Sequence, residues 1–198
     1  MLKNTIILLI GIAGTGKATI GAAMTQKNQN FRFVPHHSWI DPILNLFGDD
    51  ESKVFWGLDE KGWAALNQAR DVMFNTIAEA CPQESSFIIT YELLANNHYH
   101  QEFFDTLMQV VQKRKALFVP VRLICDLDEQ LKRVTNEQRM AHYKTRDPAL
   151  IKKRHAESEV FFSHLPTEHT LDVTQLTPEQ AASNIIHWVN KHKFPATE

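Results

Sequence analysis

Short apolar runs alternate along the chain with longer segments in which apolar residues recur every three or four positions. The apolar runs have the length and composition of buried parallel strands, and they cover residues 6–10, 31–35, 87–91, 117–125 and 170–173. Helices are predicted from Gly16, over residues 59–81 and 98–115, and after Asp126, Asp147 and Thr177. Strands that alternate with helices predict one α/β domain, residues 1–198, with helices on both faces of a parallel sheet.

Helix-capping patterns support three of these helix starts. Asp126 precedes one helix and Glu129 follows three residues later, which is the pattern of a capping box. Asp147 stands before Pro148, and proline is favoured at the first position of a helix. The segment "TPEQ", residues 177–180, combines both features. Each pattern predicts a side chain that binds the first N–H groups of its helix.

The segment "GIAGTGKAT", residues 11–19, directly follows the first predicted strand. Its glycines allow a tight turn and a close approach of the backbone to phosphate oxygens, and the helix that begins at Gly16 points its positive end toward them. Lys17 supplies a mobile charge for the β- and γ-phosphates of a nucleotide. We therefore expect a phosphate-binding loop of the Walker A type. Its candidate nucleotide-binding residues are Gly11, Ala13, Gly14, Thr15, Gly16, Lys17, Ala18 and Thr19.

Ala18 departs from the usual pattern G-x-x-x-x-G-K-[ST], in which a hydroxyl ligates the magnesium of the nucleotide. The order of a lysine, a small residue and a threonine, from Lys17 to Thr19, resembles the loop of the nucleoside monophosphate kinases. In that group magnesium is held largely through water and acidic side chains, and the threonine contacts the α-phosphate. Ala18 thus argues against a switch GTPase or a motor ATPase and is compatible with a small kinase.

The whole chain resembles the small-molecule kinases of the P-loop superfamily, such as shikimate kinase, gluconate kinase and chloramphenicol phosphotransferase. Besides the loop, the segments "RVTNEQRMAHYKTRDP" (residues 133–148) and "TLDVTQLTPEQAA" (residues 170–182) carry this resemblance. It implies a three-layer fold with five parallel strands in the order 2-3-1-4-5, a small lid at about residues 134–148, and ATP with Mg²⁺ as cofactors. In relatives, the loop around Thr174 borders the adenine.

Three arginines accompany the lid segment. A phosphoryl group in transfer carries spread negative charge, and arginine offers fixed forks of donors to such a group. Arg139 is the first candidate for a catalytic and nucleotide-binding role, Arg133 for nucleotide binding and Arg146 for substrate binding. The alternative is that any of them belongs to a solvated basic helix face.

The stretch "VPHHSWIDP" follows the second strand, where relatives bind the phosphoryl acceptor. Asp41 is the candidate to orient the acceptor hydroxyl or to act as a base; alternatively, it caps a helix at Pro42. His36 and His37 are candidate substrate-binding residues, although adjacent histidines in a loop are often surface residues. Shikimate kinases carry aspartates directly after this strand, so the two histidines argue against shikimate as the substrate.

Tyr91 and Glu92 end the third strand, and ligands bind at the carboxyl ends of strands in such sheets. Both are candidate substrate-binding residues, and Glu92 is also expected to hold magnesium through water. Arg70 is a further substrate-binding candidate: it falls on an apolar helix stripe with Leu66, so its charge requires an anionic partner. We expect that partner to be the substrate or a buried carboxylate such as Asp41 or Glu92.

Composition argues against several other classes of protein. The formal net charge of −2 does not indicate the basic surface that nucleic-acid binders use. Cys81 and Cys125 match neither a disulfide nor a metal motif, and no apolar run approaches transmembrane length. We expect a cytoplasmic protein that binds neither nucleic acid nor membrane, as a monomer or a homodimer.

Together these features predict an ATP-dependent phosphotransferase with a small-molecule acceptor. One alternative is a nucleoside or nucleotide kinase. A second is a nucleotide-binding regulatory protein with little turnover, which Ala18 and the lack of an aspartate directly after the second strand keep open.

Overall fold

A computed structural model describes residues 2–48, 54, 55, 57–136 and 145–192. Five strands form one sheet in the order β2-β3-β1-β4-β5, and every neighbouring pair is parallel. The strands are Thr5–Ile10 (β1), Phe31–Pro35 (β2), Ser86–Tyr91 (β3), Leu117–Ile124 (β4) and His169–Asp172 (β5). The fold class and the strand order expected from the sequence are confirmed.

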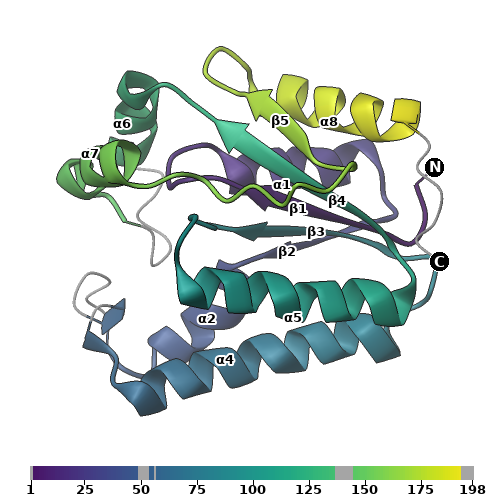
Figure 1. Cartoon of the computed structure of the whole chain (residues 1–198), viewed down its shortest axis with the longest axis horizontal. Helices are drawn as coiled ribbons and strands as arrows, with labels where there is room; N and C mark the ends of the chain where they lie inside the picture. The colour runs from purple at the N-terminus through teal and green to yellow at the C-terminus, as the bar shows by residue number, and fades with distance from the viewer. Residues whose placement is uncertain (1, 49–53, 56, 137–144, 193–198) are drawn as a thin grey trace.

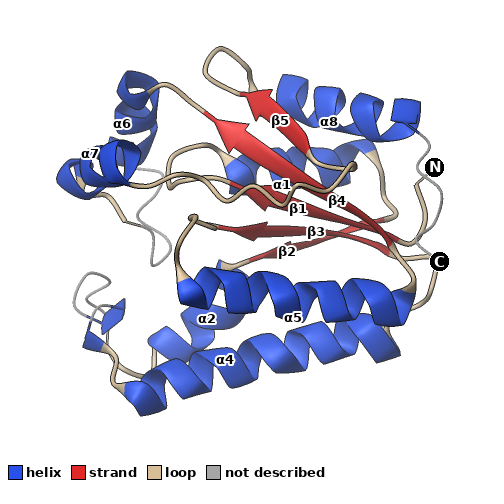
Figure 2. Ribbon diagram, in the orientation of Figure 1, coloured by secondary structure: helices blue, strands red, loops and turns tan. Residues whose placement is uncertain are grey.

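Helices lie on both faces of the sheet and beyond one of its ends. They are α1 (Lys17–Lys27), α2 (His37–Leu44), α4 (Glu60–Asn75), the π-helical turn η1 (Thr76–Ala80), α5 (His98–Arg114), α6 (Leu127–Thr135), α7 (Pro148–Glu157) and α8 (Pro178–His192). Figure 1 shows α1 and α8 on one face, and α4 and α5 on the other. All strand arrows in Figure 2 point toward the side on which α6 and α7 lie.

The alternation of side chains along β1 divides the core into two layers. Ile6, Leu8 and Ile10 pack with residues of α4 and α5, whereas Ile7 and Leu9 pack with residues of α1 and α8. All five side chains are fully buried, and burial of such a side chain contributes about 1.5–3 kcal/mol. Because β1 is buried on both faces, as a central parallel strand should be, the loop at its carboxyl end starts from a rigid support.

The helix predicted over residues 59–81 is α4 continued by η1. Asp59 caps its start, since Asp59 Oδ1 accepts a hydrogen bond from Gly62 N–H (2.9 Å). Arg114, the last residue of α5, is 1% exposed and donates to the carbonyls of Ile77 and Pro82. This arginine joins the end of η1 to α5 in one layer. Across the described ranges, no helix is both long enough and apolar enough to cross a bilayer.

Two of the predicted helix caps are present. Thr177 N–H donates to Gln180 Oε1 (2.9 Å) and Gln180 N–H donates to Thr177 Oγ1 (3.3 Å), which is a reciprocal capping box. Asp147 Oδ1 accepts from Ala149 N–H (2.8 Å). These bonds define the first turns of α8 and α7.

The capping box predicted for Asp126 and Glu129 is wrong. The Asp126 side chain makes no hydrogen bond to the start of α6. Glu129 pairs instead with Arg133 one turn later, at 2.8 Å between Oε1 and Nε, because a bond between two charged groups is stronger than one to a neutral N–H. The Asp126 N–H donates to Thr174 Oγ1 (3.0 Å), which attaches α6 to the loop after β5.

Candidate functional site

The loop between β1 and α1 turns tightly because of its glycines. Gly14 and Gly16 have φ angles of +94° and +84°, in the left-handed region that favours glycine. A Cβ added to Gly11 would lie 2.7 Å from Thr15 Oγ1, so this position has no room for a side chain. Thr15 Oγ1 donates to the Ile12 carbonyl (2.9 Å), which holds the turn closed. A loop of this shape before a helix start can bind phosphate through its N–H groups.

Lys17, the first residue of α1, folds its amino group back over the loop. Its Nζ donates to the carbonyls of Gly11 (2.6 Å) and Ile12 (3.1 Å). The positive charge therefore lies at the carboxyl end of β1, where a bound nucleotide would place its phosphates. Further along α1, the exposed Thr19 hydroxyl donates to the Gly16 carbonyl (2.9 Å).

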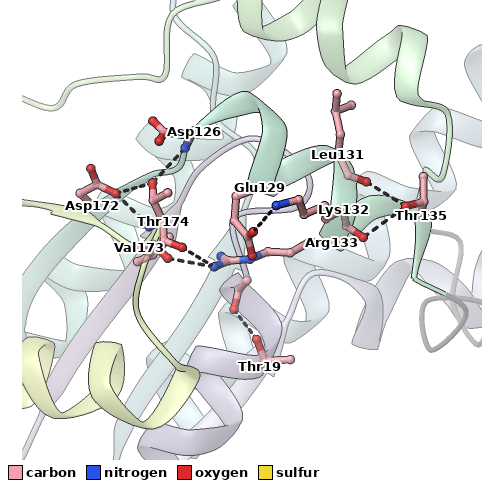
Figure 3. Close-up of polar contacts among 11 residues, drawn as sticks. Thr19, Asp126, Glu129, Leu131, Lys132, Arg133, Thr135, Asp172, Val173 and Thr174 are labelled. Atoms are coloured by element: carbon pink, nitrogen blue, oxygen red, sulfur yellow. Dashed lines mark hydrogen bonds and ion pairs between the residues drawn. The ribbon is translucent and has the colours of Figure 1, made fainter.

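Arg133 connects α6, the loop after β5 and the phosphate-binding loop. Its Nη2 donates to the carbonyls of Val173 (3.0 Å) and Thr174 (3.1 Å), as Figure 3 shows. Its Nη1 would lie 3.9 Å from a Cβ added to Gly16. Arg133 and Thr174, two candidate nucleotide-binding residues, are thus neighbours beside the loop. Their roles in binding a nucleotide stay predictions.

Thr174 orders the turn after β5. Its hydroxyl donates to Asp172 Oδ1 (2.7 Å) and accepts from Asp126 N–H (3.0 Å), and its own N–H also donates to Asp172 Oδ1 (2.9 Å). The hydrogen bonds from Thr174 lower the pKa of the Asp172 carboxyl below its usual value. The backbone around Thr174 is therefore fixed before any ligand binds.

Glu92 lies against the phosphate-binding loop, at the end of β3. Its Oε2 accepts from Ala13 N–H (3.1 Å), and its Oε1 forms an ion pair with Nη1 of Arg154 in α7. The sequence placed Glu92 at this edge of the sheet but did not single out Arg154. The only sign of Arg154 in the sequence is the basic triplet of residues 152–154, which is equally typical of a solvated helix face.

The segment after α7 holds that helix near the end of β3. Leu94 and Val160 form an isolated antiparallel bridge. Ala95 N–H donates to the Glu159 carbonyl (2.8 Å), and Phe161 N–H donates to the Leu93 carbonyl (3.1 Å). These backbone bonds explain how Arg154 reaches a carboxylate that lies sixty-two positions earlier in the chain.

Glu92 is the described residue that is expected to hold magnesium through water. No group of three or more histidine, cysteine, aspartate or glutamate side chains within the described ranges is placed to hold a metal. Glu92 uses both oxygens, yet each carboxylate oxygen can accept more than one hydrogen bond. A water bound to magnesium could therefore donate to Glu92 as well. The role of Glu92 toward magnesium stays a prediction.

Three aromatic side chains gather on the other side of the loop. His36 follows β2, Tyr91 ends β3 and His100 lies in the first turn of α5; together they are called the aromatic cluster. The ring centroids of His36 and Tyr91 are 4.5 Å apart and those of Tyr91 and His100 are 5.8 Å apart, both edge to face. Phe103 stacks on Tyr91 at 3.7 Å and supports it from the core. His100 was not singled out from the sequence, because only the packing of α5 brings it here.

The aromatic cluster is uncharged at neutral pH. Burial lowers the pKa of His36 well below 6.5, and repulsion from Lys17 and from the protonated forms of His37 and His100 lowers it further. Burial also lowers the pKa of His100, whose Nδ1 accepts from Leu94 N–H (2.8 Å). Burial raises the pKa of Tyr91 to about 12. Tyr91 is the register partner of Ile10, the residue directly before Gly11, so this cluster lies beside the phosphate-binding loop.

His37 and Asp41 form a pair one turn apart on α2. The distance between His37 Nδ1 and Asp41 Oδ1 is 2.8 Å, and both side chains are largely shielded from solvent. Pro42 lies inside α2 and Asp41 precedes it within the same helix, so the alternative that Asp41 caps a helix at Pro42 is wrong. A role for Asp41 or His37 toward an acceptor stays a prediction.

The carboxylate partners expected for Arg70 are wrong. Arg70 binds neither Asp41 nor Glu92: it pairs with Asp71, with Nε and Nη2 at 3.0 and 2.9 Å from Oδ1, and its Nη2 lies 3.8 Å from Glu102 Oε1. It borders a surface hollow between α4 and α5. The physical reason is that nearer carboxylates, on the same helix and on the adjacent α5, already balance its charge. A role for Arg70 toward the substrate stays a prediction.

Only part of the predicted lid can be placed. Arg139, the first catalytic candidate, lies outside the described residues. Arg146 is exposed just before α7. The lid boundaries at residues 134–148 stay a prediction, although α6 ends at Thr135 and α7 begins at Pro148.

The sheet order, the glycine loop after β1 and Lys17 at the start of α1 define the P-loop kinase type of fold. No protein-family model matches the chain, and no curated protein matches it by sequence. Solved structures do match along almost its whole length.

A presumed kinase from Chloroflexus aurantiacus is similar over 100% of both chains, with a TM-score of 0.68 and 14% sequence identity. Thymidylate kinase from Candida albicans matches with a TM-score of 0.62 and 16% identity, covering 96% of this chain and 93% of its own. Shikimate kinase from Acinetobacter baumannii, in complex with shikimate, matches with a TM-score of 0.58 and 16% identity over 96% of both chains. At these identities the similarity establishes the fold.

Proposed function

We propose that this protein is an ATP-dependent phosphotransferase that acts on a small-molecule acceptor. The observation that carries the proposal is the position of Lys17 between two sets of side chains. On one side lie Arg133 and Thr174, which are joined by a hydrogen bond beside Gly16 and which we assign to the border of the nucleotide. On the other side lies the aromatic cluster, whose Tyr91 pairs in register with Ile10, the residue directly before the loop.

Each part of the site has a distinct role in this proposal. The N–H groups of residues 11–19 and the start of α1 hold the phosphates, and Lys17 moves from the Gly11 and Ile12 carbonyls to neutralise the group in transfer. Arg139 adds positive charge from the lid. Asp41 orients the acceptor hydroxyl. Mg²⁺, bound with ATP through water near Glu92, would supply further neutralisation of the phosphate charge.

The comparisons support a kinase because several neighbours in fold are named as kinases with small acceptors. Besides shikimate kinase and thymidylate kinase, a gluconokinase from Sinorhizobium meliloti matches with a TM-score of 0.59. The similarity to a thymidylate kinase is also compatible with the alternative of a nucleoside or nucleotide kinase. The regulatory alternative rests on Ala18 and on the histidines that stand directly after β2 in place of an aspartate. We further propose a cytoplasmic location, a monomer or homodimer, and no binding to nucleic acid or membrane.

Two measurements test the proposal in sequence. Calorimetric titration with ADP and Mg²⁺ shows whether the loop binds a nucleotide, and a screen of small metabolites for ATP consumption shows whether an acceptor exists. The proposal predicts nucleotide binding and acceptor-dependent ADP formation. Nucleotide binding without transfer to any acceptor would favour the regulatory alternative, and no binding at millimolar ADP would contradict both.

A further inference from the structure

The aromatic cluster lies beside the phosphate-binding loop, because Tyr91 is the register partner of Ile10. His36 meets Tyr91 edge to face at 4.5 Å, and Tyr91 is held by Phe103, which stacks on it from the core. His36 N–H donates to Thr90 Oγ1 (3.2 Å), which fixes the backbone where β2 ends. Such side chains combine apolar faces with polar edges, so they suit a ligand that has rings and hydroxyl groups.

The hydrogen bond from Leu94 determines the tautomer of His100. Because His100 Nδ1 accepts from Leu94 N–H, the proton of the neutral ring is on Nε2. Nε2 can then donate to a hydroxyl or carbonyl oxygen. Tyr91 keeps its phenolic proton, since burial raises its pKa to about 12. The aromatic cluster therefore provides neutral hydrogen-bonding groups and no positive charge.

Two cations that the structure describes around the aromatic cluster, Arg154 and Arg70, are each balanced by carboxylates. Glu92 pairs with Arg154, and Arg70 pairs with Asp71 and approaches Glu102. Asp41 adds a carboxylate from α2, where its side chain is 16% exposed. Lys17 is positive, but its position in the loop assigns it to the nucleotide phosphates.

A negatively charged acceptor would be disfavoured at this position. It would approach Asp41 and Glu92 with like charge, or it would have to separate Arg154 from Glu92 and leave that carboxylate without its cation. A ring-bearing alcohol without negative charge is not repelled by these carboxylates and does not need to separate Arg154 from Glu92. It gains hydrogen bonds from neutral donors and contact with aromatic faces.

From this geometry we infer that the acceptor is a ring-bearing alcohol without negative charge, such as a nucleoside or a glycoside, and neither a carboxylic acid nor a phosphate ester. The inference rests on the proposed function, because it names the acceptor class for the same site. It separates this chain from kinases whose acceptor carries an acid group.

Matched pairs of acceptors test the inference. ATP consumption is measured with the intact protein, ATP and Mg²⁺ on nucleosides against their monophosphates, and on glycosides against the corresponding uronides. We expect turnover in the uncharged set, with kcat/KM at least about tenfold above that of the matched acid. Higher kcat/KM for the acids would overturn the inference while leaving the kinase proposal intact. No turnover in either set, with ADP still bound, would overturn the proposed function and the inference with it.

A variant tests the electrostatic reason. Glu92→Gln removes the carboxylate that balances Arg154, so the ratio of acid to uncharged turnover should rise by roughly tenfold or more. Glu79→Gln is the control, because Glu79 pairs with Lys113 in an exposed position, and its ratio should match the wild type. A general loss of magnesium binding or of activity would lower turnover of both acceptors, so it would leave the ratio of acid to uncharged turnover unchanged. If Glu92→Gln fails to bind ADP, Asp41→Asn is measured in the same way, and an unchanged ratio would contradict the inference.

Discussion

Glu92, at the end of β3, forms an ion pair with Arg154 in α7. The same carboxylate accepts the Ala13 N–H of the phosphate-binding loop. The Glu92 side chain thus contacts both the phosphate-binding loop and α7, the helix that follows the lid segment. A rearrangement of the loop on nucleotide binding is expected to reach α7 through it.

The first prediction concerns the strength of this pair. The side chains of Glu92 and Arg154 are 20% and 21% exposed, so solvent screens them only in part. A double-mutant cycle with Glu92→Gln and Arg154→Gln, measured by chemical denaturation, should give a coupling free energy of about 1 kcal/mol. The control cycle uses Glu79→Gln and Lys113→Gln, since that pair is 63% and 57% exposed, and its coupling should be close to zero. Equal coupling in the two cycles would show that the pair adds no more than an exposed contact.

A second prediction concerns Gly14. Its φ of +94° is unfavourable for alanine, and an added Cβ would lie 2.9 Å from Val134 Cγ2 of α6. Gly14→Ala should therefore lower the free energy of unfolding by roughly 1–3 kcal/mol and weaken ADP binding. Gly57→Ala is the control, because a Cβ there meets nothing within 4 Å. Thermal denaturation and calorimetry check both, and unchanged ADP affinity in Gly14→Ala would separate this glycine from the nucleotide site.

A third prediction concerns pH. The pKa values of His36 and His100 are lower in the folded protein than their ordinary value of 6.5. Below pH 6.5 these two histidines therefore bind more protons in the unfolded chain than in the folded protein. The stability that their neutral forms contribute is complete above pH 6.5 and is lost as the pH falls toward the folded-state pKa values. Denaturation between pH 7.5 and about 5 should show falling stability, and His36→Gln should reduce the slope.

The exposed His155 of α7 provides the matched control for this pH dependence. His155→Gln should keep the wild-type slope, because its side chain has little contact with the folded core. A slope in His36→Gln equal to that of the wild type would show that the neutral state of His36 does not contribute to stability.

A fourth prediction concerns Ala18. If magnesium is held through water and acidic residues, Ala18→Ser should change the magnesium dependence of nucleotide affinity only modestly. Glu92→Gln should change it more, because Glu92 places a charge beside Ala13 of the loop. Magnesium titrations with ADP compare the two. A large gain in Ala18→Ser with no effect in Glu92→Gln would indicate a metal-deficient loop and favour the regulatory alternative.

The elements of the fold were predictable because their signals are local. The apolar run of residues 87–91 differs from β3 by one residue. The length of such a run predicts the length of the strand, and its apolar composition predicts that the strand is buried. The phosphate-binding loop was predictable for the same reason. Glu92 was placed beside that loop by the general rule that the carboxyl ends of parallel strands share one edge.

The contacts that the sequence did not reveal come from packing between distant segments. His100 and Arg154 reach the site from α5 and α7, and nothing in their local sequence distinguishes them from surface residues. The partners of Arg70 were missed because the choice among carboxylates depends on how α4 packs on α5. The failed cap at Asp126 shows the same limit on a smaller scale, since Arg133 competes for Glu129.

The most direct test of the account is phosphoryl transfer from ATP by Lys17→Ala, measured with an acceptor found in the screen and compared with Lys27→Ala. Lys27 lies exposed at the other end of α1, so its variant should keep the wild-type rate. The account predicts that Lys17→Ala loses transfer by on the order of a hundredfold or more, because the amino group stabilises the charge of the transition state. A wild-type rate in Lys17→Ala would contradict it.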